Sequence, residues 1–154
     1  MVLLILLTLH VIGLVLMSGT TIVDYLTYQT FWRLYRLEKV VPKSLIQLMS
    51  RFSRLIGIGA AVLILTGFSM MFATHGVFGG MIWFRIKFVL VILLVLNGVL
   101  VGRRLGSRLR RQASEINFTY TESVSRLKAN MNRFYLAQLS IFIAIIFLSI
   151  FKFN

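Results

Sequence analysis

Four long apolar blocks constrain the fold of this chain more than any other feature of its sequence. They cover about residues 1–30, 52–74, 81–102 and 134–152, and a membrane-spanning helix needs about 20 mostly apolar residues. Hydrophobic residues make up 58% of the chain and charged residues only 14%, whereas soluble domains contain roughly 25% charged residues. We therefore predict an all-α fold: a single domain over residues 1–154, built as an antiparallel four-helix transmembrane bundle.

Basic residues separate the blocks in an alternating pattern. The formal net charge is +13, from 17 Lys and Arg against 4 Asp and Glu. Most of the basic residues lie in two segments, about residues 31–51 and 103–133. This alternation is the positive-inside pattern, and such segments also attract anionic lipid headgroups, which argues against nucleic acid as the partner. We predict a bacterial cytoplasmic (inner) membrane protein with both basic segments in the cytoplasm and both termini on the other side.

Several classes of chemistry are excluded by composition. The chain has no cysteine, so disulfides, thiolate metal sites and cysteine nucleophiles are ruled out. It also has no glycine-rich phosphate loop, nucleophile elbow or HExxH motif. The first block lacks a basic n-region and a small-residue cleavage site, and this predicts a retained helix rather than a signal peptide.

Polar residues of the first block share one helical face. His10 and Asp24 lie on that face, and ionisable groups inside a membrane helix usually face other helices, a cavity or a ligand. At the helical rise of 1.5 Å per residue, His10 and Lys87 lie roughly 13 and 9 Å from the outer ends of their helices. Asp24 lies near the cytoplasmic face, at the level of Arg54. We expect an outer polar zone at His10 and Lys87, and an inner zone in which Asp24 and Arg54 form a structural polar pair.

Each position leaves a second interpretation open. His10 could bond to a neighbouring carbonyl instead of a ligand, and Lys87 could extend to the outer interface. His75, in the turn after the second block, is either exposed or a second axial ligand. Asn97 is expected to make a helix–helix hydrogen bond. The second block is rich in small residues, which let membrane helices approach closely: Gly57, Gly59, Ala60, Ala61 and Gly67.

The opening LTLHVIGLVLMSGTTIVDY resembles the first helix of the HemJ-type protoporphyrinogen oxidases and of related CopD-like four-helix membrane proteins. The third block, WFRIKFVLVILLVLNGVLVGRR, is similar to the W-x-x-x-K helix of that family. The resemblance implies haem b bound through His10 as the metal ligand, and a functionally required, catalytic Lys87. Lys87, Arg85 or Arg54 would then face the haem propionates as cations. The chain departs from the family in having no second histidine between residues 11 and 35.

Two functions follow from these observations. The first is a membrane oxidoreductase with haem b, acting on a porphyrin or a quinone. The alternative is a non-enzymatic membrane subunit or scaffold whose basic cytoplasmic segments bind a partner protein or anionic lipid; the plain apolar fourth block favours it. A proton pathway through His10 and Asp24 is disfavoured, because the two lie roughly 21 Å apart along one helix. Contact with the lipid bilayer, and a homodimer or another membrane subunit as partner, are further expectations.

Overall fold

A computed structural model describes residues 1–38, 41–75, 77–113 and 121–151. Parts of both predicted basic segments, residues 39–40 and 114–120, lie outside the described residues, as does residue 152 of the predicted fourth helix. Within the described ranges the ordered elements are helices and no strand is present, which confirms the prediction of an all-α four-helix bundle. Four helices in these ranges are long and apolar enough to cross a membrane. The chain is an integral membrane protein.

The helices extend beyond the predicted apolar blocks at the basic end. α1 (Val2–Glu38) and α2 (Lys43–Ala73) meet at the turn around Pro42, and the short η1 (Val77–Gly80) leads into α3 (Ile82–Leu96). The π-helical η2 (Asn97–Gly102) and α4 (Arg103–Ala113) continue α3, and α5 (Glu122–Ile150) closes the bundle. Much of the two predicted basic segments is thus helix, because these stretches have an apolar face that packs in the bundle.

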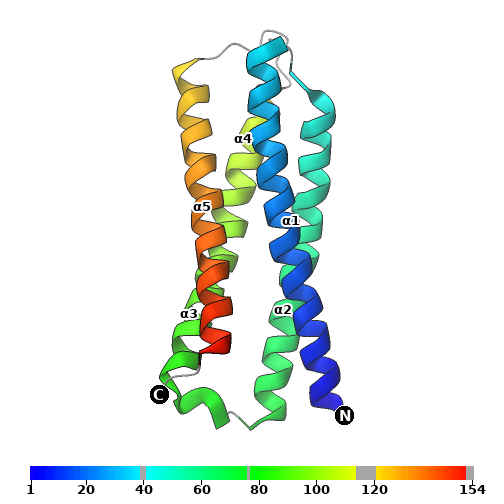
Figure 1. The fold of residues 1–154 in the computed structure, drawn as a ribbon, viewed down its shortest axis with the longest axis vertical. Coiled ribbons are helices and arrows are strands. Elements are labelled where there is room, and N and C mark those ends of the chain that lie inside the picture. Colours follow the sequence, from blue (N-terminus) through cyan, green and yellow to red (C-terminus); the bar gives the residue numbers. More distant parts are fainter. Residues whose placement is uncertain (39–40, 76, 114–120, 152–154) are drawn as a thin grey trace.

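Figure 1 shows an elongated bundle in which α1 begins and α5 ends at the same end. At 1.5 Å per residue, the 37 residues of α1 extend about 55 Å. The hydrocarbon core of a bilayer is only about 30 Å thick. The bundle is therefore long enough to cross the membrane and to continue beyond it at the basic end.

The basic end has an interior like that of a water-soluble helix bundle. Tyr28 Oη donates to the carbonyl of Lys128 at 2.7 Å, and Lys128 Nζ lies 5.3 Å from the centre of the Trp32 ring. These contacts join α1 to α5 around a buried cluster from α1, α2, α4 and α5, which we call the aromatic core. It contains Tyr28, Phe31, Trp32, Tyr35, Met49, Leu105, Leu109, Val124, Leu127, Met131 and Tyr135.

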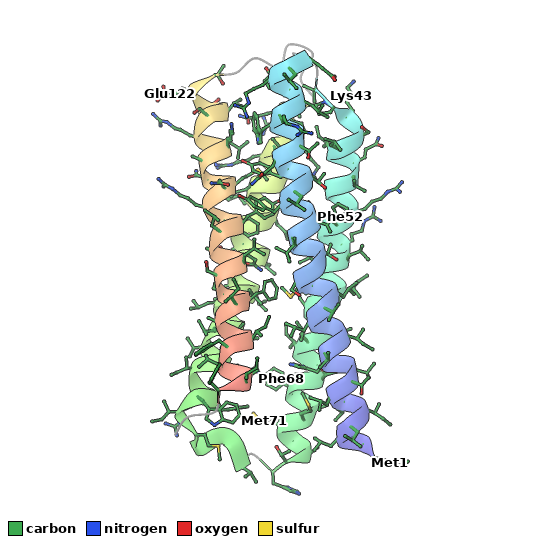
Figure 2. All side chains as sticks on the ribbon, viewed as in Figure 1. Met1, Lys43, Phe52, Phe68, Met71 and Glu122 are labelled. Atoms are coloured by element: carbon green, nitrogen blue, oxygen red, sulfur yellow. The ribbon has the colours of Figure 1, made fainter. Side chains whose placement is uncertain are left out.

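The opposite half presents apolar side chains outward. Val15, Leu65 and Ile143 are 64–68% exposed, which suits a surface covered by lipid. Figure 2 shows side chains that end in nitrogen gathered around the half near Lys43 and Glu122, and carbon predominating toward Met1. The interior of this half, which we call the membrane core, is centred on Met17, Leu94, Phe142 and Ile145.

Close packing of α1 against α2 depends on two glycines. A Cβ added at Gly59 would lie 3.0 Å from the backbone N of Met17 and 3.1 Å from the carbonyl O of Gly13. A Cβ added at Gly13 would in turn lie 3.3 Å from the carbonyl O of Gly59. Only glycine lets the two backbones approach this closely, so part of the small-residue content of α2 has the role that we predicted.

Candidate functional site

His10 is held in one orientation between α1 and α2. Its Nδ1 lies 2.8 Å from Thr66 Oγ1, and the Thr66 hydroxyl lies 2.6 Å from the carbonyl O of Val62, to which it donates. A hydroxyl has a single proton, so His10 Nδ1 must be the donor in the first bond. A neutral imidazole then carries its lone pair on Nε2. This bond to Thr66 favours the tautomer in which Nε2 can bind a metal.

The outer polar zone brings together two of the predicted residues. Lys87 of α3 lies near enough to His10 to act on it electrostatically, at the shared depth that we predicted. Arg85 is exposed on the same helix. His75 lies in the turn after α2 with a φ of 50°, eight residues beyond Gly67, which packs beside His10 Cε1. α2 ends at Ala73, about 9 Å beyond Gly67 at the helical rise, and His75 lies past that end. The role of His75 as a second axial ligand stays a prediction.

The inner zone gives Asp24 a different partner from the Arg54 that we predicted. Tyr135 Oη donates to Asp24 Oδ2 at 2.8 Å, and Oδ1 is buried with no hydrogen-bond partner. Only 8% of Asp24 is exposed, whereas Arg54 is exposed on α2. Bringing a guanidinium out of the headgroup region would cost hydration, while the Tyr135 ring already lies in the aromatic core. The Asp24–Arg54 pair is therefore corrected to an Asp24–Tyr135 hydrogen bond.

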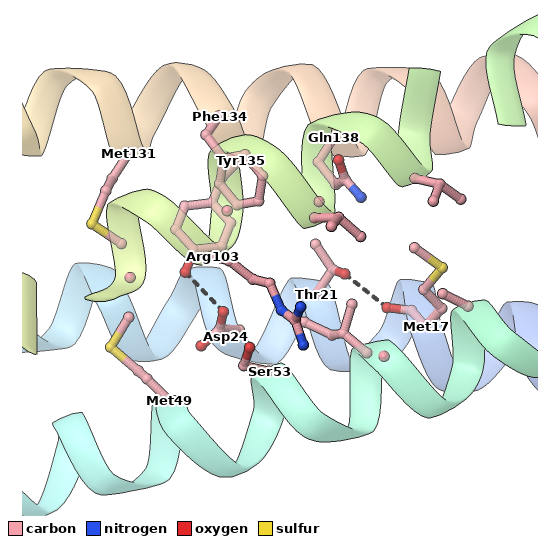
Figure 3. Close-up of a pocket in the computed structure, with 18 of the residues that line it drawn as sticks. Met17, Thr21, Asp24, Met49, Ser53, Arg103, Met131, Phe134, Tyr135 and Gln138 are labelled. Atoms are coloured by element: carbon pink, nitrogen blue, oxygen red, sulfur yellow. Dashed lines mark hydrogen bonds between the residues drawn. The ribbon is translucent and has the colours of Figure 1, made fainter. Parts of the chain in front are cut away.

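Asp24 lines a cavity of about 360 Å³ enclosed by all four long helices. Figure 3 shows Asp24, Ser53 and Arg103 close together at this cavity, with Tyr135 hydrogen-bonded to Asp24. The wall is otherwise mostly small or apolar, so we call this the Asp24 cavity. Its small residues come from α2, η2 and the helices around η2: Gly57, Ala60, Ala61, Gly98, Gly102 and Gly106.

A shallow groove adjoins the Asp24 cavity on the outside of the bundle. Ser53, Val99, Arg103 and Arg110 line both hollows. The groove lies between α2 and the η2–α4 segment and is rich in arginine and serine. We call it the basic groove, and its lining is Ser50, Ser53, Arg54, Val99, Leu100, Arg103, Arg104, Ser107 and Arg110.

The π-helical η2 forms part of both hollows. Asn97 Nδ2 donates to Gln138 Oε1 at 2.8 Å, which confirms the predicted helix–helix hydrogen bond. A Cβ at Gly102 would lie 2.7 Å from Phe134 Cζ, so this glycine makes room for an aromatic ring of α5. π-Helical turns are frequent at functional sites. Sequence reasoning missed this wall, although Gly98, Gly102 and Gly106 recur at the four-residue spacing of one helical face.

In the described part of the chain, no group of three or more His, Asp or Glu side chains could hold a metal ion. Among these residues, any metal at His10 would thus have at most one further ligand of this kind. Comparison with family models, curated proteins and solved structures found no match to this chain. The HemJ-type resemblance stays a prediction that rests on the sequence motifs.

Proposed function

We propose that this integral membrane protein is a redox protein that binds haem b through Nε2 of His10. The observation that carries the proposal is the hydrogen-bond chain from His10 Nδ1 through Thr66 to the carbonyl of Val62. Histidines that bind metals commonly donate their other ring N–H to a fixed acceptor, which sets the tautomer and the ring orientation.

Two features near His10 support a haem with one histidine ligand. Lys87 supplies a cation in the same zone, suited to a propionate. Phe68 and Phe88, the sequence neighbours of Gly67 and Lys87, bring α2 and α3 together, with ring centres 6.4 Å apart. Bound haem would supply a one-electron iron couple, whose potential depends on the axial ligand and the polarity around it. The chain's contribution is to orient the imidazole and to keep the site in apolar surroundings.

The test is the visible spectrum of the detergent-purified protein, oxidised and dithionite-reduced, beside two variants. We expect a Soret band that is lost in His10→Ala. The matched control is His75→Ala, which changes the other histidine of the chain and should keep the band. A colourless wild-type protein that is folded and stays colourless after incubation with hemin would refute the proposal. Loss of the band in both variants would refute the single-ligand assignment.

We also propose that the basic end of the bundle faces the cytoplasm of a bacterial cell. The exposed arginines of this end include Arg33, Arg36, Arg51, Arg54, Arg104 and Arg108. Such residues are retained on the cytoplasmic side during insertion. The outer polar zone, with His10 and Lys87, then lies toward the non-cytoplasmic face.

A further inference from the structure

The basic groove and the Asp24 cavity adjoin each other and share four lining residues, and we refer to the two together as the hollow. Arg103 and Arg110 line both parts. Along α2, the exposed Arg51 and Arg54 are followed by the exposed apolar Ile58 and Leu65. The hollow thus lies where the apolar surface gives way to the basic end. A ligand that fits it would need a polar part at this boundary and an apolar part that extends toward the membrane centre.

The hollow carries charge of both signs. Asp24 Oδ1 is buried without a hydrogen-bond partner, which costs about 1–3 kcal/mol or more for a charged group unless a donor arrives. Arg110 lies near enough to act on Asp24 electrostatically, but it makes no hydrogen bond to Oδ1. Arg54, Arg103 and Arg104 are exposed around the groove. A ligand with both a cationic donor and an anion would complement this arrangement.

The apolar wall of the hollow has room for a hydrocarbon chain. Gly57 faces open space, since a Cβ added there would meet no atom within 4 Å. Ala60, Ala61 and Ile64 continue this wall along α2, and Val95 faces them from α3. The charged Asp24 and Arg103 lie instead near Tyr135, whereas Thr21 and Gln138 lie farther along the cavity (Figure 3). The hollow is therefore amphipathic along its length.

We propose that the groove and the cavity together bind one phospholipid with an ethanolamine headgroup, taken from the leaflet at the basic end. The arginines of the groove bind its phosphate, since guanidinium groups match phosphate oxygens in charge and geometry. Its ammonium group donates to Asp24 Oδ1. One acyl chain lies along the Gly57 wall. This site is separate from His10, and binding there does not depend on haem.

The first test compares two lipids that differ in whether the headgroup ammonium can donate a hydrogen bond. The full-length protein is reconstituted into nanodiscs of equimolar phosphatidylethanolamine and phosphatidylcholine, extracted into mild detergent and analysed by native mass spectrometry. We expect one retained phosphatidylethanolamine, enriched over phosphatidylcholine, whose methylated ammonium cannot donate. Asp24→Asn should remove this preference, while its amide oxygen can still accept from Tyr135. Equal retention of the two lipids by the wild-type protein would overturn the proposal.

The second test blocks the part of the hollow that is proposed to hold the acyl chain of the lipid. Gly57→Leu places a side chain in the hollow and should lower lipid retention by about tenfold or more, equivalent to about 1.4 kcal/mol. Gly19→Leu is the matched control, because a Cβ at Gly19 also meets no atom within 4 Å and Gly19 lies outside the hollow. Circular dichroism checks that both variants are folded. Equal lipid retention by the two variants would contradict the assignment.

The third test asks whether the arginines of the groove bind the phosphate, and whether that phosphate belongs to a lipid or to a soluble anion. Arg104→Gln should lower retention of both lipids, whereas Arg36→Gln, at an exposed arginine of α1 outside the groove, should not. Inorganic phosphate is then added to the delipidated protein. Thermal stabilisation by phosphate equal to that by phosphatidylethanolamine would assign the groove to a soluble anion and overturn the lipid proposal. The Soret band at His10 should be unchanged in all of these variants, so the two proposals fail independently.

Discussion

Two glycines two residues apart on α2, Gly57 and Gly59, offer a direct measurement of the packing that joins α1 to α2. Gly59→Ala would put a methyl group 3.0 Å from the backbone N of Met17 and 3.1 Å from the carbonyl O of Gly13. These are backbone atoms, so the strain cannot be relieved by rotating a side chain. Gly57→Ala would put the same methyl group into open space.

The difference between the two variants isolates the cost of overpacking. Replacing Gly by Ala in a helix interior gains about 1 kcal/mol of helix propensity, and this gain applies to both positions. Overpacking costs about 1–3 kcal/mol and applies only to Gly59. We therefore expect Gly57→Ala to be neutral or stabilising, and Gly59→Ala to be less stable than Gly57→Ala by about 1–3 kcal/mol.

Reversible unfolding of the detergent-solubilised protein in increasing SDS, followed by circular dichroism, measures this difference. Gly19→Ala on α1 is a second control, because its Cβ also enters open space. If Gly59→Ala and Gly57→Ala unfold at the same SDS fraction, the close glycine contact does not hold the two helices together. The physical account of the α1–α2 pair would then be wrong.

Three further predictions concern the two polar zones and the orientation. Tyr135→Phe removes the observed hydrogen bond to a buried carboxylate and should destabilise the protein by about 1–3 kcal/mol in the same SDS assay; unchanged stability would contradict this. Thr66→Val removes the acceptor of the His10 N–H and should weaken haem retention by about 10–100-fold, measured by haem titration, whereas unchanged retention would leave Thr66 without a positioning role. Because the chain has no cysteine, Ser123→Cys and Val77→Cys report its topology: in intact cells an impermeant maleimide should label only the cysteine at position 77, and the reverse pattern would invert the orientation.

The helix count could be predicted because it depends on composition alone. Blocks of about 20 apolar residues must be helical in lipid, and the four blocks needed no tertiary information. The depth of His10 and Lys87 was predictable for a similar reason, since helical rise and chain direction fix it. The sequence was sufficient for features that depend only on the hydropathy of each residue and on its position along a helix.

The partner of Asp24 could not be predicted in the same way. Depth placed both Arg54 and Tyr135 near Asp24, but depth does not say which helix faces which. The α5 helix presents Tyr135 inward because the same helical face carries Met131 and Gln138, which are also buried. Tyr135 lies in the fourth apolar block, and the apolar character of that block gave no indication that the Tyr135 hydroxyl is the partner of Asp24. Rotation about the helix axis, which only the packed structure supplies, decided the pairing.

The helices continue past the apolar blocks for a related reason. The blocks end where continuous apolar character is lost, near residues 30 and 134, but an amphipathic pattern predicts that the first helix runs on beyond residue 30, as α1 does. Beyond these points the chain changes from apolar on all sides to apolar on one side, as in Phe31 and Tyr35 beside the exposed Arg33 and Arg36. Such a pattern is typical of a helix that leaves lipid and enters water. The membrane boundary and the helix boundary are therefore different positions in this protein.

The arrangement of the two polar zones also bears on the proton-pathway alternative. Such a pathway would need water or polar groups between His10 and Asp24, which are fourteen residues apart on α1. Between them, Met17 is 2% exposed and packs with Leu94 and Phe142 in the membrane core. Thr21 gives its hydroxyl proton to the carbonyl of Met17, so it is committed to its own helix. The Asp24 cavity reaches along α1 as far as Met17. In the described residues the membrane core lies between this cavity and His10, and each zone is expected to act on its own side of the bilayer.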